Sequence, residues 1–173
     1  MTLRTNARVA GITFLVYVAA GISSLLLAGR TQAVDVLSLV TSFCALVLGV
    51  TLYALTRDVD RDLAMVALLC RVIESVPGKA GGAIYFGVGS TIFCALLLRG
   101  RLIPAALAWL GVAASALMVM LLLLQRGGLF SGALNWASSI TWLVWLPLLV
   151  FELTFASWLI VKGTAAPQPA HVR

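Results

Sequence analysis

Residues 68–82 read LLCRVIESVPGKAGG, and this stretch decides how the chain folds. It begins as apolar sequence of the kind found in membrane helices, and then Arg71 and Glu74 follow. Because lipid penalises both charges, the stretch is either part of a membrane helix with a polar interior face or a segment that does not cross. The number of crossings and the place of any polar site depend on this choice.

The composition of the whole chain favours a membrane protein. Of its 173 residues, 62% are hydrophobic and 10% are charged, whereas soluble domains carry about 25% charged residues. A water-soluble core cannot bury so much apolar surface at this length. The net charge is +6, but the basic residues lie singly or in pairs between apolar runs. That pattern is typical of topology signals beside an anionic leaflet, so nucleic acid is not an expected partner.

Six apolar runs predict an all-α, polytopic six-transmembrane-helix bundle. A spanning helix needs about 20 residues, and the third run is the short one that carries the charges. We assign residues 1–163 to this transmembrane domain and residues 164–173 to a disordered cytoplasmic tail. Asp58 or Asp60 is expected to cap the third helix. The predicted helices are 9–28, 34–55, 59–76, 81–98, 103–124 and 134–161.

Small residues four positions apart predict close contacts between helices. Ala83 and Gly87 form one such pair in the fourth predicted helix, and Gly111 and Ser115 form another in the fifth. In lipid this spacing lets helix backbones approach each other closely.

The loop charges predict that both termini lie in the cytoplasm. Cytoplasmic loops are enriched in Lys and Arg, and six crossings place most basic residues on that side. If residues 59–76 failed to cross, the later helices would invert and this bias would be lost. The predicted inside residues are Arg4, Arg8, Arg57, Arg61, Arg99, Arg101, Lys162 and Arg173, and the outside residues are Arg30, Lys79 and Arg126.

Apart from charges in the first few residues of a predicted helix, three charged residues lie within the apolar runs: Arg71, Glu74 and Glu152. Arg71 and Glu74 are three residues apart and share a helix face, which must point into the bundle because a lone charge at mid-bilayer costs about 2.5–3.5 kcal/mol. At 1.5 Å per residue, Arg71 lies about 18 Å and Glu152 about 14 Å from the cytoplasmic ends of their helices. We therefore predict that the third and sixth helices turn these side chains toward each other.

These charges are the candidate catalytic residues. One Arg between two Glu is net negative, so one carboxyl is expected to hold a proton or to bind a cation. Glu74 or Glu152 would donate a proton to a lipid-like substrate, and Arg71 would hold the partner carboxylate or an anionic headgroup. Three roles stay open: a structural helix clamp or regulatory subunit, a site for a ligand or reaction, and a proton-coupled transport path. Whether the protein is an enzyme also stays open, as does its oligomeric state.

Aromatic and hydroxyl side chains around the charges predict a pocket for a small lipophilic ligand. Trp145 and Thr141 lie on the Glu152 face of the sixth helix, and Phe155 lies one turn away. The remaining predicted lining residues are Tyr53 and Tyr85.

No metal site and no cofactor are expected. Cys44, Cys70 and Cys94 each lie inside an apolar run without a CxxC motif or a nearby histidine. His171 is the only histidine and lies in the tail, so a His-based metal or haem site is not expected. The expected partners are the lipid bilayer and a small lipophilic ligand.

Four stretches of the chain carry a resemblance to a known family. They are ARVAGITFLVYVAAGISS (7–24), RVIE (71–74), GVGSTIFCALLLRGRLIPAALAWLGV (87–112) and FELTFASWLIVKG (151–163). Together they resemble the bacterial integral-membrane family called domain of unknown function 4386, over about residues 4–165. The resemblance implies a multi-pass protein of the bacterial plasma (inner) membrane, with Arg71, Glu74 and Glu152 at motif positions, and it implies no activity. Members often carry a longer segment after RVIE, whereas this chain runs directly into PGKAGG.

Overall fold

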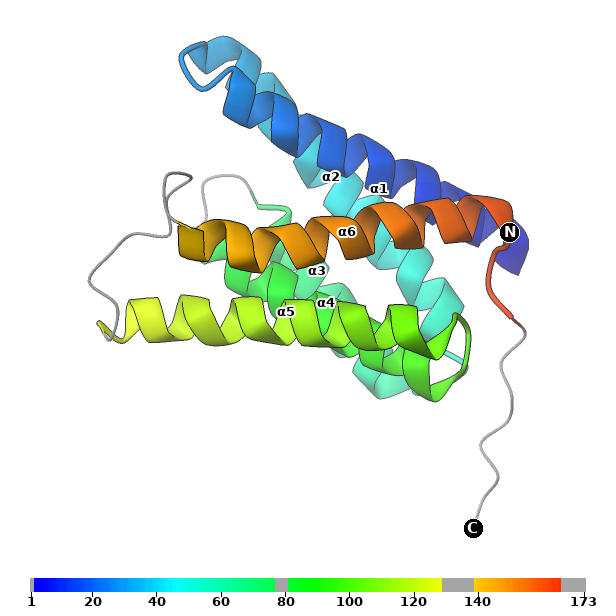
Figure 1. The fold of residues 1–173 in the computed structure, drawn as a ribbon. Helices are drawn as coiled ribbons and strands as arrows, with labels where there is room; N and C mark the ends of the chain where they lie inside the picture. Colours follow the sequence, from blue (N-terminus) through cyan, green and yellow to red (C-terminus); the bar gives the residue numbers. More distant parts are fainter. Residues whose placement is uncertain (1, 77–80, 129–138, 166–173) are drawn as a thin grey trace.

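A computed structural model describes residues 2–76, 81–128 and 139–165, and within α6 it describes side chains at 142 and from 145 onward. The described residues form six α-helices and no strands, which confirms the all-α fold class (Figure 1). The helices are α1 (Leu3–Leu26), α2 (Thr31–Thr56), α3 (Arg61–Glu74), α4 (Gly82–Arg99), α5 (Ala105–Arg126) and α6 (Ser139–Val161).

The bounds of α3 have a local explanation at each end. The Asp60 carboxylate caps the helix by accepting a hydrogen bond from the Leu63 amide at 3.1 Å, which confirms one of the two predicted caps. The helix ends at Glu74, three residues before Pro77, and the residue directly before a proline disfavours helical backbone, so the helix cannot easily continue. The predicted helix 59–76 is therefore shortened at both ends.

Four of the helices are long and apolar enough to cross a membrane, namely α1, α2, α4 and α5. Helix α3 has 14 residues, or about 21 Å at 1.5 Å per residue, which is less than a hydrocarbon core of about 30 Å. The described part of α6, Trp145–Val161, is a shorter apolar helix. A crossing by α3 or α6 stays a prediction from the sequence.

The helices are arranged as a ring that follows the order of the chain. Each helix from α1 to α5 packs against its successor, and α6 packs back against α1. The α1–α6 interface contains an edge-on contact of the Phe14 and Phe155 rings, whose centroids are 5.5 Å apart. Interior positions of the ring are filled by large apolar side chains, including Leu48, Phe93 and Leu97.

Two glycines show how closely the helices approach. A Cβ at Gly87 of α4 would lie 2.6 Å from Val119 Cγ2 and 3.6 Å from the Ser115 carbonyl oxygen of α5. The small-residue spacing predicted close helix contacts, and Gly87 makes one with α5. A Cβ at Gly11 of α1 would lie 2.7 Å from the Ala156 carbonyl oxygen of α6, so the closing interface also needs a glycine.

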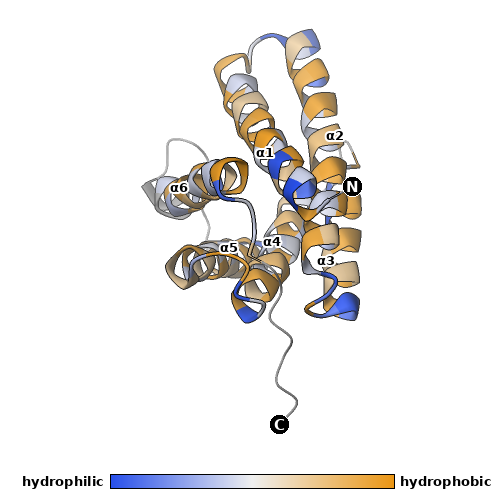
Figure 2. Cartoon of the chain, turned by 90° about the vertical axis from the view of Figure 1, so that its right-hand side faces the viewer, coloured by the Kyte–Doolittle hydropathy of each residue, from blue (hydrophilic) through white to orange (hydrophobic). Residues whose placement is uncertain are grey.

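One end of the ring, which we call the basic end, gathers the loops 57–60, 100–104 and 162–165 and the start of α1. Arg99 and Asp60 join two of its loops through an ion pair of 3.4 Å, and the Ala165 amide donates a hydrogen bond of 3.0 Å to the Leu102 carbonyl. Hydrophilic residues gather at helix ends and apolar residues cover the helix surfaces between them (Figure 2). The basic end holds Arg4, Arg57, Arg61, Arg99, Arg101 and Lys162.

Candidate functional site

The centre of the site is an ion pair within α3. Arg71 is 1% exposed, and its Nη1 donates a hydrogen bond of 2.8 Å to Glu74 Oε2, one helical turn away. The i, i+3 spacing read from the sequence therefore brings the two charges into direct contact. Each charge neutralises the other, which lowers the cost of holding both among apolar helices.

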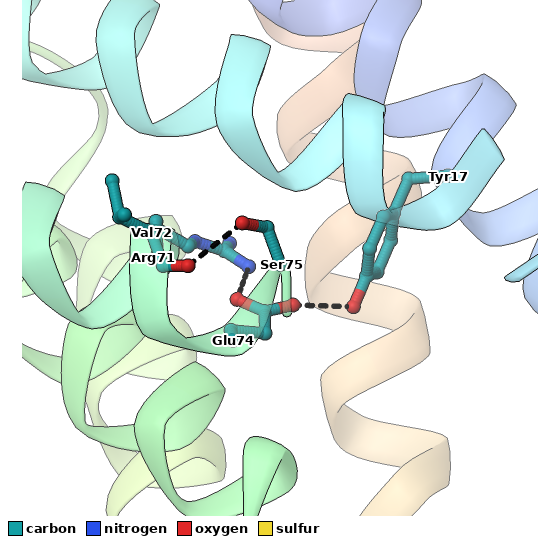
Figure 3. A network of polar contacts seen from close by, with 5 residues as sticks. All are labelled: Tyr17, Arg71, Val72, Glu74 and Ser75. Carbon is teal, nitrogen blue, oxygen red and sulfur yellow. Dashed lines mark hydrogen bonds and ion pairs between the residues drawn. The ribbon is translucent and has the colours of Figure 1, made fainter. Parts of the chain in front are cut away.

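The second carboxylate oxygen of Glu74 is hydrogen-bonded to Tyr17 of α1. The Tyr17 hydroxyl donates a hydrogen bond of 2.7 Å to Glu74 Oε1, so each carboxylate oxygen has one donor (Figure 3). This contact joins residues that are far apart in the chain and connects α1 to α3. Tyr17 and Arg71 together hold the Glu74 carboxylate in one orientation.

Phe86 of α4 completes this cluster. The Arg71 guanidinium carbon lies 4.7 Å from the centroid of the Phe86 ring, in cation–π contact. The Tyr17 ring stacks on the same phenylalanine with a centroid distance of 6.2 Å and an interplanar angle of 8°. Three helices thus fix Arg71, Glu74 and Tyr17, and we call this set the Arg71 cluster.

Glu152 of α6 differs from Glu74 in its surroundings. It is 7% exposed, and within residues 2–76, 81–128 and 139–165 it makes no ion pair. Arg71 and Glu152 line the same small cavity of about 10 Å³, so the structure brings both charges into the ring interior. However, α3 and α6 do not pack against each other in the described part of the chain, and Arg71 pairs with Glu74.

Glu152 also lines a larger cavity of about 310 Å³. Both carboxylates, Glu74 and Glu152, reach it, whereas Arg71 does not. Arg71 is paired with Glu74 and does not line this cavity, so it is not placed to receive an anionic headgroup there. The lining residues are Tyr17, Ser38, Thr41, Ser42, Ala45, Glu74, Val76, Gly82, Ala83, Phe86, Trp145 and Glu152.

The predicted lining residues fall into three groups. Trp145 lines the large cavity, and Phe155 lines the small one, where it stacks on Phe151 at a centroid distance of 5.3 Å. Tyr53 and Tyr85 line neither of these two cavities. The side chain of Thr141 lies outside the described residues.

Sequence reasoning missed Tyr17 and Phe86. A signal was present for Tyr17, because a buried tyrosine hydroxyl needs a hydrogen-bond partner and this one lies in the middle of an apolar run. Phe86 carried no such signal, since a phenylalanine in an apolar helix is ordinary core sequence. Its role depends on which side chains the fold places over its ring.

Two ionisable side chains, Glu152 and Tyr17, line the large cavity beside Glu74. A carboxyl group and a phenol hydroxyl can each donate or accept a proton. Over the described ranges, no group of three or more His, Cys, Asp or Glu side chains is arranged to hold a metal ion.

The fold and the site define an all-helical protein of membrane type with a polar cluster in its interior. Residues 78–163, about half of the chain, match the model of the family described as Domain of unknown function (DUF4386). The resemblance seen in the sequence is thereby confirmed over α4, α5 and α6. Neither a curated protein nor a solved structure matches the chain.

Proposed function

We propose that the chain is a multi-pass protein of the bacterial inner membrane, with six crossings and both termini in the cytoplasm. Large apolar side chains that point away from the ring, such as Leu26, Phe43 and Trp109, support a lipid-facing outer surface. The grouping of Arg57, Arg99 and other basic residues at one end supports the orientation. The ends of the short α3 would then lie below the membrane surface on at least one side.

Within this bundle, the large cavity is proposed to bind a small lipophilic ligand and to present Glu152 to it, for binding or for proton transfer. The observation that carries the proposal is a carboxylate more than nine-tenths buried, without an ion pair in the described part of the chain, at the wall of a 310 Å³ cavity. Small-molecule pockets have volumes of about 300–1,000 Å³ and combine apolar walls with a few polar groups.

Glu74 and Glu152 would have different roles in this site. Both oxygens of Glu74 accept hydrogen bonds from fixed partners, so Glu74 serves to hold α1 and α3 in place. A helix clamp explains the Arg71 cluster well, and it leaves Glu152 without a role. Glu152 is therefore the residue that would contact the ligand or exchange a proton with it.

Mass spectrometry of co-purifying small molecules tests this function. The wild type and a Glu152→Gln variant are purified in lipid nanodiscs, and their bound small molecules are extracted and compared. We expect a molecule that is abundant with the wild type and reduced at least about tenfold in the variant, because loss of one charged contact costs about 1.4 kcal/mol or more.

Asp35→Asn is the matched control, since it makes the same carboxyl-to-amide change at an exposed position of α2. The Asp35→Asn variant should retain the same co-purifying small molecule as the wild type. Equal amounts of every molecule in the wild type and Glu152→Gln would contradict a ligand role for Glu152.

A further inference from the structure

We propose that the large cavity recognises an amphiphilic organic cation, an aryl- or alkyl-ammonium compound, with Glu152 as the counter-ion. This inference rests on the proposed function, because it names the ligand class of the same cavity. It follows from three features of the site: the balance of charge, the side chains around Glu152 and the size of the space.

The balance of charge leaves one negative group at the cavity. Arg71 is neutralised by Glu74 at 2.8 Å, and Tyr17 satisfies the other Glu74 oxygen at 2.7 Å. Glu152 has no such partner within the described residues. An isolated charge among apolar helices is costly, so the Glu152 carboxyl needs either a proton or a positively charged partner. A bound cationic ligand would be such a partner.

The lining of the large cavity favours a cation over an anion. Its described side chains include two carboxylates and no Lys, Arg or His. Arg126 comes near Gly81 at the same end of the bundle, but it is exposed and does not line the cavity. Among the described residues, an anionic ligand would therefore meet no positive side chain beside Glu152.

Other side chains in the lining of the large cavity can stabilise an ammonium group as well. Trp145 lines the same cavity, and an indole ring is the best aromatic partner for a cation. Ser38 and Ser42 of α2 contribute hydroxyl oxygens, which can accept hydrogen bonds from an N–H donor.

The volume of about 310 Å³ indicates an organic ligand. A single water takes about 30 Å³ of liquid volume, so the space is much larger than a bare ion or one water needs. The apolar walls, which include Phe86, Ala45 and Ala83, would cover the hydrocarbon part of the ligand.

Three probes of one skeleton test the inference: 3-phenylpropylamine, 3-phenylpropanol and 3-phenylpropionate. They differ mainly in charge at neutral pH, being positive, neutral and negative. Each is titrated calorimetrically into the wild-type protein in nanodiscs, with protein-free nanodiscs as the correction for partition into lipid. We expect the amine to bind at least about tenfold more tightly than the alcohol, and the carboxylate to bind most weakly.

Variants connect this preference to Glu152. Glu152→Gln should reduce the affinity for the amine at least about tenfold and leave that for the alcohol within about threefold, because only the charged contact is lost. Glu152→Asp retains the negative charge and should keep the preference for the amine. Asp35→Asn should behave as the wild type. Elution as a single species in size-exclusion chromatography shows that each variant is folded.

The outcomes separate this inference from the proposed function. If none of the three probes binds the wild type, the proposal that this cavity binds a ligand is itself wrong. If the alcohol or the carboxylate binds as tightly as the amine, the pocket stands and the inference of a cationic ligand is overturned. An amine preference that survives in folded Glu152→Gln overturns the role of Glu152. The probe series on the wild type decides the ligand class even if a variant does not fold.

Discussion

The two halves of the helix ring differ in what fills their interiors. Toward the basic end, the space holds apolar side chains such as Phe14, Leu55, Leu97 and Leu159. In the other half, the interior holds the Arg71 cluster, the hydroxyls of α2 and a cavity of about 310 Å³. The comparison thus sets a half with an apolar interior against a half whose interior holds the candidate site.

The largest expected effect comes from removing the charge that neutralises Glu74. Arg71→Met should lower the free energy of unfolding by about 3–5 kcal/mol, because it leaves a buried carboxylate without its partner. Thermal unfolding in detergent, followed by size-exclusion chromatography, measures the loss as a lower Tm. The double variant Arg71→Met with Glu74→Gln should recover part of it.

The exposed ion pair between Arg99 and Asp60 is the control for this experiment. Its removal in Arg99→Gln should cost at most about 1 kcal/mol, since solvent screens such pairs. Equal losses in Arg71→Met and Arg99→Gln would show that the interior of the second half is as well hydrated as the surface.

A smaller effect is expected from overfilling the packed half. Gly11→Val places a side chain where a Cβ would lie 2.7 Å from the Ala156 carbonyl oxygen. Because the obstacle is backbone, α1 and α6 must move apart, at a cost of about 1–3 kcal/mol. The same thermal assay measures it.

Gly21→Val on the same helix is the matched control, because nothing lies within 4 Å of a Cβ built there. It should leave the Tm close to that of the wild type. A Gly21 variant as unstable as the Gly11 variant would attribute the effect to helix propensity instead of packing.

The smallest effect concerns the link between α1 and the site. Tyr17→Phe removes the hydroxyl that donates to Glu74 and keeps the ring that stacks on Phe86. We expect a loss of about 1 kcal/mol in stability, since polar contacts in membrane bundles are modest. A Tm above that of the wild type would show that this hydrogen bond is strained.

Sequence reasoning found the helices and the charged residues, because apolar runs and isolated charges are local signals. It placed Arg71 and Glu74 on one face, and they form an ion pair. It also predicted that the third and sixth helices turn Arg71 and Glu152 toward each other, which depends on how α3 and α6 are positioned across the ring. Spacing along one helix cannot supply that information, and neither can it show that Phe86 lies beneath the guanidinium group.

The circular order of the helices has a consequence for how the protein is made. In the described part of the chain, the main interfaces join helices that follow each other in the sequence, and the one exception is the interface between α1 and α6. Helices α2 and α4 make a minor contact in addition. Helices leaving the ribosome can therefore dock one after another, as short-range contacts favour. Closure waits for the last helix, which brings Glu152 into surroundings that the first five have already assembled.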